Sequence, residues 1–396
     1  MRSAAEQDAA DVLAAYRAQF LRSDDVIAYL DGNSLGRPLA ASRDRLSAFA
    51  AEQWGARLIR GWDEEWMDLP LRIGDEIARV TLGAEPGQTT IADSTTVLIY
   101  KLVRAAVAAR PGRSEIVIDR DNFPTDRYIV EGVATELGLR VVWIDAADAV
   151  TADAVSAVLT DQTAVVVVSH VAYRSGYLSD AAAITTVVHD AGALLVLDLC
   201  HSVGVVPVEL DAWGVDLAVG CTYKYLNGGP GAPAFAYVRA DLQGEFRQPI
   251  QGWIGSVTPF EMGQGYAPAA GIRGFLSGTP PIVGMLAMQD MVALVDRVGL
   301  GAVRAKSVDL TTYAIELADE LLPDAMLATP RDPELRGSHV TLDHPRFAEL
   351  MPRLWGRGVL PDFRRPSGIR LGLSPLSTTF AELELGVRAI AEELAR

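Results

Sequence analysis

Short apolar runs alternate with longer amphipathic stretches through the middle of the chain. The apolar runs predict strands at 89–93, 115–119, 140–145, 164–170, 193–198 and 216–222. Helical spacing follows the first four runs, at about 96–109, 125–137, 151–159 and 180–191. Because the runs are apolar almost throughout, we expect strands that are covered on both faces. The alternation predicts an α/β fold with a mostly parallel sheet and helices on both sides.

The segments before and after this region follow other patterns. Residues 4–21 and 41–54 have helical spacing, on either side of a short strand and Gly-rich loop within 27–39. The run at 233–238 follows the strand at 216–222 so closely that we expect the two to pair antiparallel.

Beyond this point the chain is predicted to form a second unit. A Gly- and Pro-rich stretch at 251–285 precedes a long helical region at 282–322, and the remainder mixes short strands and helices. A length of 396 residues suits two cores better than one. We expect a large domain at 46–285, a small C-terminal domain at 286–396, and an N-terminal segment at 1–45 that joins the small domain.

The charge of the chain narrows the classes of partner. It carries 35 Lys and Arg against 51 Asp and Glu, a formal net charge of −16. An acidic surface repels phosphate backbones and anionic lipids, so we expect neither nucleic acid nor a membrane as a partner. The first residues lack the pattern of a secretion signal, and no uninterrupted apolar stretch reaches membrane-spanning length. We therefore expect a cytoplasmic protein.

The cysteines and histidines narrow the chemistry. Cys200 and Cys221 are the only cysteines, and both adjoin apolar runs, which predicts no disulfide framework and no zinc cluster. His189, His339 and His344 show no ligand spacing, so we predict no metal.

One lysine gives the strongest chemical signal. An apolar run ends in Asp198, with His201 three residues later, and the next run leads into Tyr223, Lys224 and a Gly-rich turn. A Lys amine binds pyridoxal 5′-phosphate (PLP) as a Schiff base, and a carboxylate keeps the pyridine nitrogen of that cofactor protonated. Both residues are expected at carboxyl ends of strands, where ligands bind in open α/β sheets. Alone, Lys224 could be a solvated loop residue and Asp198 a helix cap; together they favour PLP.

Residues after other strands could complete such a site. Thr95 and Thr96 lie between a strand and a helix, where hydroxyls and free N–H groups bind phosphate, although an ordinary helix cap fits them equally. Phe123 could stack on a flat ring or belong to the core, and Asp126 could reach polar groups of the ring. Ser169 ends its strand, where its side chain could face the ring oxygen.

One late arginine suits an amino-acid substrate. Arg370 can bind a carboxylate through two parallel hydrogen bonds, but by itself it could equally be a surface residue.

Nearly the whole chain resembles the kynureninases, which are fold-type-I PLP-dependent enzymes of the class-V aminotransferase type. The resemblance rests on YLDGNSLG at 29–36, LIRGW at 58–62, NFPTDRYI at 122–129, GCTYKYLNGGPG at 220–231, GWIG at 252–255, SGTPPI at 277–282, RGSHV at 336–340 and IRLGLSPLSTTF at 369–380. The GNSLG and TYKYLNGGPG segments separate it from the cysteine desulfurases, which share the fold. The resemblance implies a mostly parallel seven-stranded sheet and a smaller α+β domain.

The resemblance also implies roles for the cofactor residues. Lys224 would bind PLP covalently and remove the α-proton of the substrate, Asp198 would hold the pyridine nitrogen, and Tyr223 would help a later protonation. The phosphate would be held by Thr95, Thr96 and Tyr223. Further cofactor contacts would come from Phe123, Asp126, Ser169 and His201.

The substrate side of the site follows in the same way. Arg370 would bind the substrate carboxylate, Asn33 and Ser34 would line the pocket, and Trp253 and Thr279 would reach cofactor and substrate from the neighbouring subunit of a homodimer. The implied reaction is hydrolysis of L-kynurenine at the Cβ–Cγ bond to anthranilate and L-alanine, in tryptophan degradation or NAD biosynthesis. A second candidate substrate is 3-hydroxy-L-kynurenine, which would give 3-hydroxyanthranilate.

A few positions depart from the family pattern. Ser256 stands where relatives commonly carry His, Ile254 where they carry an aromatic residue, and Ala172 where they carry Asn, while Ser169 replaces a frequent Thr. These departures leave the cofactor set intact but bear on substrate preference. Relatives that prefer 3-hydroxykynurenine tend to carry Asn at the position of Thr279, so Thr279 favours unsubstituted kynurenine.

Other functions stay open. The same chemistry could act on a modified kynurenine in a biosynthetic pathway. A PLP lyase or desulfurase of the same fold would need Cys200 or Cys221 as an exposed nucleophile. A PLP-binding protein without turnover would have little use for Lys224, Asp198 and Arg370 together.

Overall fold

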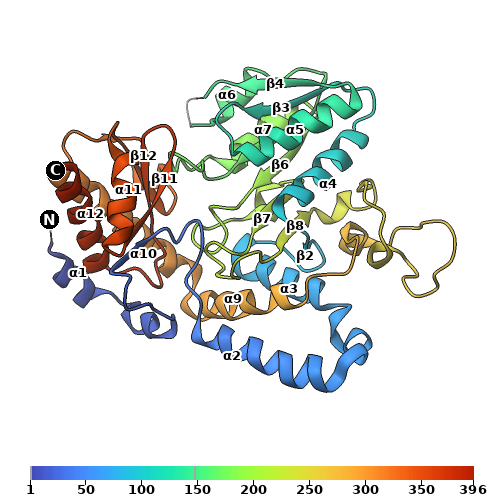
Figure 1. Ribbon diagram of the computed structural model, residues 1–396. Helices are drawn as coiled ribbons and strands as arrows, with labels where there is room; N and C mark the ends of the chain where they lie inside the picture. Colours follow the sequence, from blue (N-terminus) through green and yellow to red (C-terminus); the bar gives the residue numbers. More distant parts are fainter. Residues whose placement is uncertain (1, 147–148) are drawn as a thin grey trace.

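The larger of two sheets is the α/β unit that the alternation of apolar runs predicts. A computed structural model describes residues 2–146 and 149–396 (Figure 1). Seven strands lie in the order β2-β8-β7-β6-β5-β3-β4. Only β8 runs antiparallel to its neighbours, β7 and β2, as its closeness to β7 in the sequence predicts. The strands are β2 (Thr89–Ala92), β3 (Glu115–Asp119), β4 (Arg140–Ile144), β5 (Thr163–Ser169), β6 (Leu194–Asp198), β7 (Leu217–Cys221) and β8 (Ala234–Val238).

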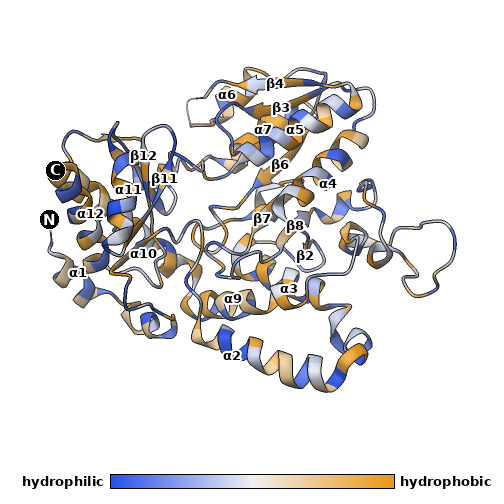
Figure 2. Ribbon diagram, viewed as in Figure 1, coloured by the Kyte–Doolittle hydropathy of each residue, from blue (hydrophilic) through white to orange (hydrophobic). Residues whose placement is uncertain are grey.

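Helices cover both faces of this sheet. On β5, Val166 and Val168 enter one core and Val165 and Val167 enter the other, because side chains of a strand alternate between faces. In Figure 2, hydrophobic colours accordingly concentrate on inner strands such as β6. One face is covered by α4 (Thr95–Ala108) and α5 (Pro124–Leu137). The other is covered by α3 (Leu69–Ile77), α6 (Ala152–Ser156), α7 (Ala181–Asp190), α8 (Leu210–Trp213) and α9 (Leu286–Val298).

The smaller unit combines both ends of the chain. Its five strands lie in the order β1-β11-β12-β10-β9, so that β1 from the N-terminal segment pairs parallel with β11. Both termini lie at this unit in Figure 1. The strands are β1 (Ala28–Leu30), β9 (Met326–Leu327), β10 (His339–Asp343), β11 (Val359–Arg364) and β12 (Gly368–Gly372). Its core also contains residues of α1 (Ala4–Ala10), α10 (Leu300–Leu321), α11 (Phe347–Gly356) and α12 (Phe380–Leu394).

The pairing of β1 with β11 supports our proposal that 1–45 and 286–396 form one domain beside 46–285. Two helices do not follow that division, because α2 (Ala40–Ala48) spans its first boundary and α9 packs on the large sheet. Helix α9 packs against α2, and its Met288 and Val292 enter a core of the large sheet. We therefore propose that the boundary between the domains lies between α9 and α10.

Two predicted helices are interrupted. Within 4–21, α1 ends at Ala10 because the Asp11 carboxylate accepts a hydrogen bond from the backbone N–H of Leu13 at 2.8 Å, and a 3-10 turn follows. Within 282–322, Gly299 separates α9 from α10 with φ of 84°, a conformation that favours glycine. Short 3-10 or π-helical turns occupy Ala14–Gln19, Phe49–Gly55, Leu58–Arg60, Trp62–Trp66, Ala78–Leu82, Ala240–Leu242, Trp253–Gly255, Gly271–Phe275, Val283–Met285 and Pro333–Leu335.

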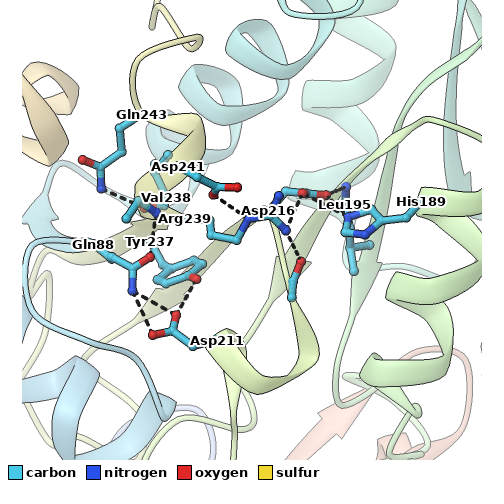
Figure 3. Close-up of polar contacts among 12 residues, drawn as sticks. Gln88, His189, Leu195, Asp211, Asp216, Tyr237, Val238, Arg239, Asp241 and Gln243 are labelled. Carbon is cyan, nitrogen blue, oxygen red and sulfur yellow. Dashed lines mark hydrogen bonds and ion pairs between the residues drawn. The ribbon is translucent and has the colours of Figure 1, made fainter.

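A buried polar network closes the edge of the large sheet where β6 and β7 begin (Figure 3). Asp216 directly precedes β7, and its side chain is 1% exposed. It accepts a hydrogen bond from the backbone N–H of Leu195 at 2.9 Å, contacts Nε2 of His189 at 2.9 Å and pairs with Arg239 at 3.3 Å. This edge is therefore filled by protein groups, which leaves the opposite edge for a ligand.

Every helix within the described residues is too short or too polar to cross a bilayer.

Candidate functional site

A cavity of about 490 Å³ lies at the carboxyl ends of the parallel strands. Side chains reach it from the ends of β5 and β6, from the turn after β7 and from the first turns of α4 and α5. The structure thus brings together ten of the predicted site residues: Thr95, Thr96, Phe123, Asp126, Ser169, Asp198, His201, Tyr223, Lys224 and Thr279.

Lys224 and a buried histidine meet in this cavity. The Nζ atom of Lys224 lies 2.9 Å from Nε2 of His201 and 5.9 Å from the ring centroid of Phe123. Burial lowers the pKa of His201 well below its ordinary value, and the charges of Lys224 and Arg370 lower it further. A neutral His201 therefore accepts a hydrogen bond from Lys224 through Nε2.

Two carboxyl groups share the same cavity. Asp198 ends β6 and accepts a hydrogen bond from the backbone N–H of Cys200 at 2.7 Å. Asp126 is 1% exposed, and its Oδ2 has no partner among residues 2–146 and 149–396. Burial raises the pKa of Asp126 well above its ordinary value, and the charges of Asp198 and Asp119 raise it further. Burial beside Asp198 therefore favours the neutral form of the Asp126 carboxyl group.

The first turn of α4 offers a site for an anion. Ser94 caps the helix and accepts from the N–H of Val97 at 3.4 Å, while Thr95 and Thr96 begin the helix at the cavity wall. The preceding Asp93 is paired with the buried Lys101 at 2.5 Å, which neutralises its carboxylate. Free N–H groups and hydroxyls at a helix N-terminus bind phosphate.

Three of the five residues predicted to bind substrate, Asn33, Ser34 and Arg370, lie together beside the cavity, in the smaller unit. Arg370 donates to Oγ of Ser34 at 2.8 Å, and its Nε lies 2.9 Å from the Asn33 amide when the oxygen of that amide faces it. Arg370 also donates to the backbone carbonyl of Tyr173 at 2.6 Å, and Tyr173 lines the cavity. Arg370 therefore lies directly behind one wall of the cavity.

Trp253 lies apart from this group. Its ring packs edge-on against Trp62 at 6.2 Å and Phe260 at 5.9 Å between centroids. Thr279, by contrast, lines the cavity of its own chain. Action of Trp253 and Thr279 across a subunit contact stays a prediction.

Sequence reasoning missed several residues around the cavity. His339 is fully buried, and its ring lies 5.3 Å from that of His201. Its only signal was its place in the RGSHV motif. Asp362 pairs with both Arg370 and Arg364, and the polar sequence around the two residues gave no sign of this contact. His170 follows Ser169 in the sequence and its side chain points to the other face, where its ring packs against Trp213 at 5.4 Å.

The cysteines lack the surroundings of a nucleophile. Cys200 borders the cavity and Cys221 lies behind it, and both are buried. The neighbouring Cys221 thiol and burial raise the pKa of Cys200 well above its ordinary value. A reactive cysteine needs an accessible thiolate, so this geometry does not support a desulfurase.

The cavity fits PLP. The Lys224 amine matches the aldehyde of the cofactor, and the unpartnered oxygen of Asp126 matches its polar edge. Asp198 matches the pyridinium, and Phe123 matches the face of the ring. The N-terminus of α4 matches the phosphate. Solved structures with the same fold include the cysteine desulfurase of Thermococcus onnurineus NA1, with a TM-score of 0.81 and 17% identity over 99% of this chain and 98% of that one. A mutant of the C-DES lyase with PLP has a TM-score of 0.80 and 17% identity over 94% of this chain and 98% of that one. The fold is thus that of the fold-type-I PLP-dependent enzymes.

Sequence comparisons narrow this class to one family. Residues 303–390 match the profile of the kynureninase C-terminal domain, and residues 81–233 match that of Cys/Met metabolism PLP-dependent enzymes. Kynureninases of Pseudomonas fluorescens and of Burkholderia pseudomallei strain K96243 are each 40% identical to the chain, over 98% of its length and 94% of theirs. The chain belongs to the kynureninase family.

Proposed function

We propose that the protein uses PLP to hydrolyse the Cβ–Cγ bond of L-kynurenine, giving anthranilate and L-alanine. The observation that carries the proposal is the cavity in which Lys224, His201 and the carboxyl pair of Asp126 and Asp198 meet, in a chain of the kynureninase family. Fold alone would fit other PLP enzymes, and the buried thiols argue against a desulfurase.

The binding residues follow from the chemistry of the cofactor. When bound, PLP supplies an electron-accepting ring that stabilises negative charge at the α-carbon. Lys224 holds it covalently, Asp198 keeps its ring nitrogen protonated, and Phe123 covers one ring face. Thr95, Thr96 and Tyr223 hold the phosphate at the N-terminus of α4. Asp126, as a neutral carboxyl group, can donate a hydrogen bond to the polar edge, which Ser169 also contacts.

Two residues move protons in this proposal. Lys224 takes the α-proton of the substrate, and neutral His201 orients the Lys224 amine by accepting a hydrogen bond from it. Water adds to the γ-carbonyl carbon of the substrate, the Cβ–Cγ bond breaks to release anthranilate, and Tyr223 would donate a proton to Cβ, which becomes the methyl carbon of L-alanine. Burial raises the pKa of Tyr223 far above its ordinary value, so the hydroxyl keeps its proton until the reaction needs it.

Substrate binding completes the proposed site. Arg370 binds the α-carboxylate beside Asn33 and Ser34. Thr279 favours unsubstituted L-kynurenine over 3-hydroxy-L-kynurenine, because a Thr reaches a ring hydroxyl less well than an Asn.

We also propose a cytoplasmic homodimer in which Trp253 and Thr279 reach the site of the partner subunit. Support comes from two groups of apolar side chains, each more than half exposed. One group lies in the turns after α2 (Trp54, Leu58 and Ile59), and the other lies in the segment after Trp253 (Val257, Phe260 and Met262). Burial of such side chains stabilises association. Sedimentation equilibrium of the PLP-loaded protein tests the assembly, and a monomer at micromolar concentration would contradict it.

The activity is tested by giving PLP-loaded protein L-kynurenine and, separately, 3-hydroxy-L-kynurenine, and following the fluorescence of the aromatic product. We expect anthranilate to form, faster than its hydroxylated analogue. Lys224→Ala should remove both turnover and the visible absorbance of the covalently held cofactor. A wild-type protein that holds PLP but releases no product from either substrate would contradict the proposed reaction and direct the search to ring-substituted kynurenines.

A further inference from the structure

Three charged side chains share the face of the small sheet that lies away from its core. Ile369 and Leu371 point into the core, so Arg370 points to the opposite face. Asp362 on β11 lies directly opposite Arg370 on β12, and Arg364 follows two residues later on the same face. One oxygen of Asp362, Oδ2, lies 2.8 Å from Nη2 of Arg370 and 2.7 Å from Nε of Arg364.

Arg370 has few donors left for a substrate. Its Nε faces Asn33, Nη1 donates to the carbonyl of Tyr173, and Nη2 contacts both Ser34 and Asp362. A guanidinium has five N–H groups; three are hydrogen-bonded here and Nη2 also forms an ion pair with Asp362, so at most two N–H groups remain for a substrate. The side chain is also 1% exposed. Arg370 alone therefore cannot form two parallel hydrogen bonds with a carboxylate unless it releases partners within the protein.

Arg364 has the free donors that Arg370 lacks. Its side chain is 30% exposed, and it is held at Nε by Asp362. Its Nη2 atom lies 3.5 Å from Oγ of Ser34, the same oxygen that Arg370 contacts at 2.8 Å. Two guanidinium groups thus converge on one hydroxyl of the predicted substrate pocket.

The charge of Arg364 acts on the cavity. It contributes, after burial and nearer charges, to lowering the pKa of His201 and of His339. His201 is the residue that contacts Lys224, so Arg364 lies within electrostatic reach of the reacting groups.

We propose that Arg364 binds the α-carboxylate of the substrate together with Arg370, and that this second guanidinium makes the site specific for α-amino acids. This inference rests on the proposed function. Asp362 holds both arginines in place, and Ser34 lies where their free ends meet. Arg364 supplies the open N–H groups, while Arg370 supplies the buried charge behind them.

Arg364→Met tests the proposal, with Arg365→Met as the matched control, because Arg365 is the next residue and its side chain is exposed in the turn after β11. The ligands are L-kynurenine and kynuramine, the same amine without the α-carboxylate. Binding is followed by the change in visible absorbance of the PLP-loaded protein, and turnover of L-kynurenine by product fluorescence. Loss of a charge-assisted contact predicts a KM for L-kynurenine raised by about 10-fold to 100-fold, with kcat changed less than about threefold.

The pattern across ligands separates binding from structure. Arg364→Met should leave the dissociation constant of kynuramine within about twofold of wild type. Arg365→Met should leave the dissociation constants of both L-kynurenine and kynuramine within the same range. An unchanged KM for L-kynurenine, or equal weakening of both ligands, would overturn the proposal. If Arg364→Met does not retain the cofactor, Arg364→Gln takes its place with the same criteria. Failure of the proposed function is distinct, because it appears as missing turnover in the wild-type protein itself. In that case Arg364 is still tested by comparing the binding of L-alanine with that of ethylamine, which lacks the carboxylate.

Discussion

The amine of Lys224 lies 2.9 Å from Nε2 of His201, a buried imidazole whose pKa is held well below its ordinary value. Burial and neighbouring positive charges make an uncharged ring the stable form. A neutral ring can accept a hydrogen bond from an ammonium group, whereas a charged ring would repel it. The pair therefore orients the amine on which the proposed reaction depends.

Loss of this orientation should be visible in turnover. His201→Phe keeps a ring of similar size but removes the acceptor, so we expect kcat to fall by about 10-fold to 100-fold, the range of a hydrogen bond to a charged group. Single-turnover measurements with L-kynurenine, at a PLP absorbance matched to wild type, give the number. His344→Gln is the control, because the ring of His344 contacts Phe347 and accepts a hydrogen bond from the backbone N–H of Arg346 rather than lining the cavity. Equal kcat in wild type and His201→Phe would exclude this role.

The two carboxyl groups of the cavity should respond differently to the same substitution. Because its raised pKa keeps Asp126 protonated, Asp126→Asn replaces a neutral group by another neutral group that donates a hydrogen bond. Asp198→Asn instead removes the charge that is proposed to hold the pyridinium. We expect kcat to fall less than about tenfold for Asp126→Asn and more than about 100-fold for Asp198→Asn.

Steady-state kinetics and the visible spectrum of each variant measure this difference. The reverse order of effects would show that Asp126 is the charged partner and that Asp198 carries the proton.

The large sheet and much of the candidate site could be predicted from the sequence, because both depend on local patterns. Continuous apolar runs identify strands buried on two faces, and Ser169 and Asp198 end such runs. Side chains at these ends must then meet at one edge of the sheet. The assigned roles of these residues stay predictions until they are tested.

Other parts of the site depend on contacts between distant segments. Arg364 meets Ser34 only because β1 pairs with β11, across 330 positions of sequence. In the sequence, the residues around Arg364 have the composition of a polar turn. The break at Asp11 likewise depends on the charged partners that tertiary packing brings to it, Arg17 and Lys306. Neither feature has a periodicity that a sequence pattern could detect.

Asp31, beside the arginine pair, should make the stability of the fold depend on pH. Burial raises the pKa of Asp31 from 3.8 to about 6, and the charge of Asp362 adds to this effect. A carboxyl group with a raised pKa in the folded state stabilises the fold below its ordinary pKa, and this contribution is lost as the pH rises through about 6. The loss amounts to about 3 kcal/mol.

Asp31→Asn removes this titration. Relative to wild type, the free energy of unfolding of the variant should therefore rise by about 3 kcal/mol between pH 3.5 and pH 7.5. Urea denaturation at the two pH values measures the change. A difference between wild type and variant that stays constant with pH would show that Asp31 titrates alike in the folded and unfolded chain.

The polar network around Asp216 should govern stability and leave catalysis unchanged, because it lies at the edge of the sheet opposite the cavity. Asp216→Ala leaves the side chain of Arg239 and the N–H of Leu195 without their buried acceptor. Breaking a buried ion pair from one side costs about 3–5 kcal/mol. Asp241→Ala removes the other carboxylate bound to Arg239. The Asp241 side chain is 67% exposed, so its loss should cost less than about 1 kcal/mol. Urea denaturation measures both costs, and KM for L-kynurenine should stay within about twofold of wild type in each variant. A large change in KM for Asp216→Ala at full cofactor occupancy would mean that the two edges of the sheet are coupled.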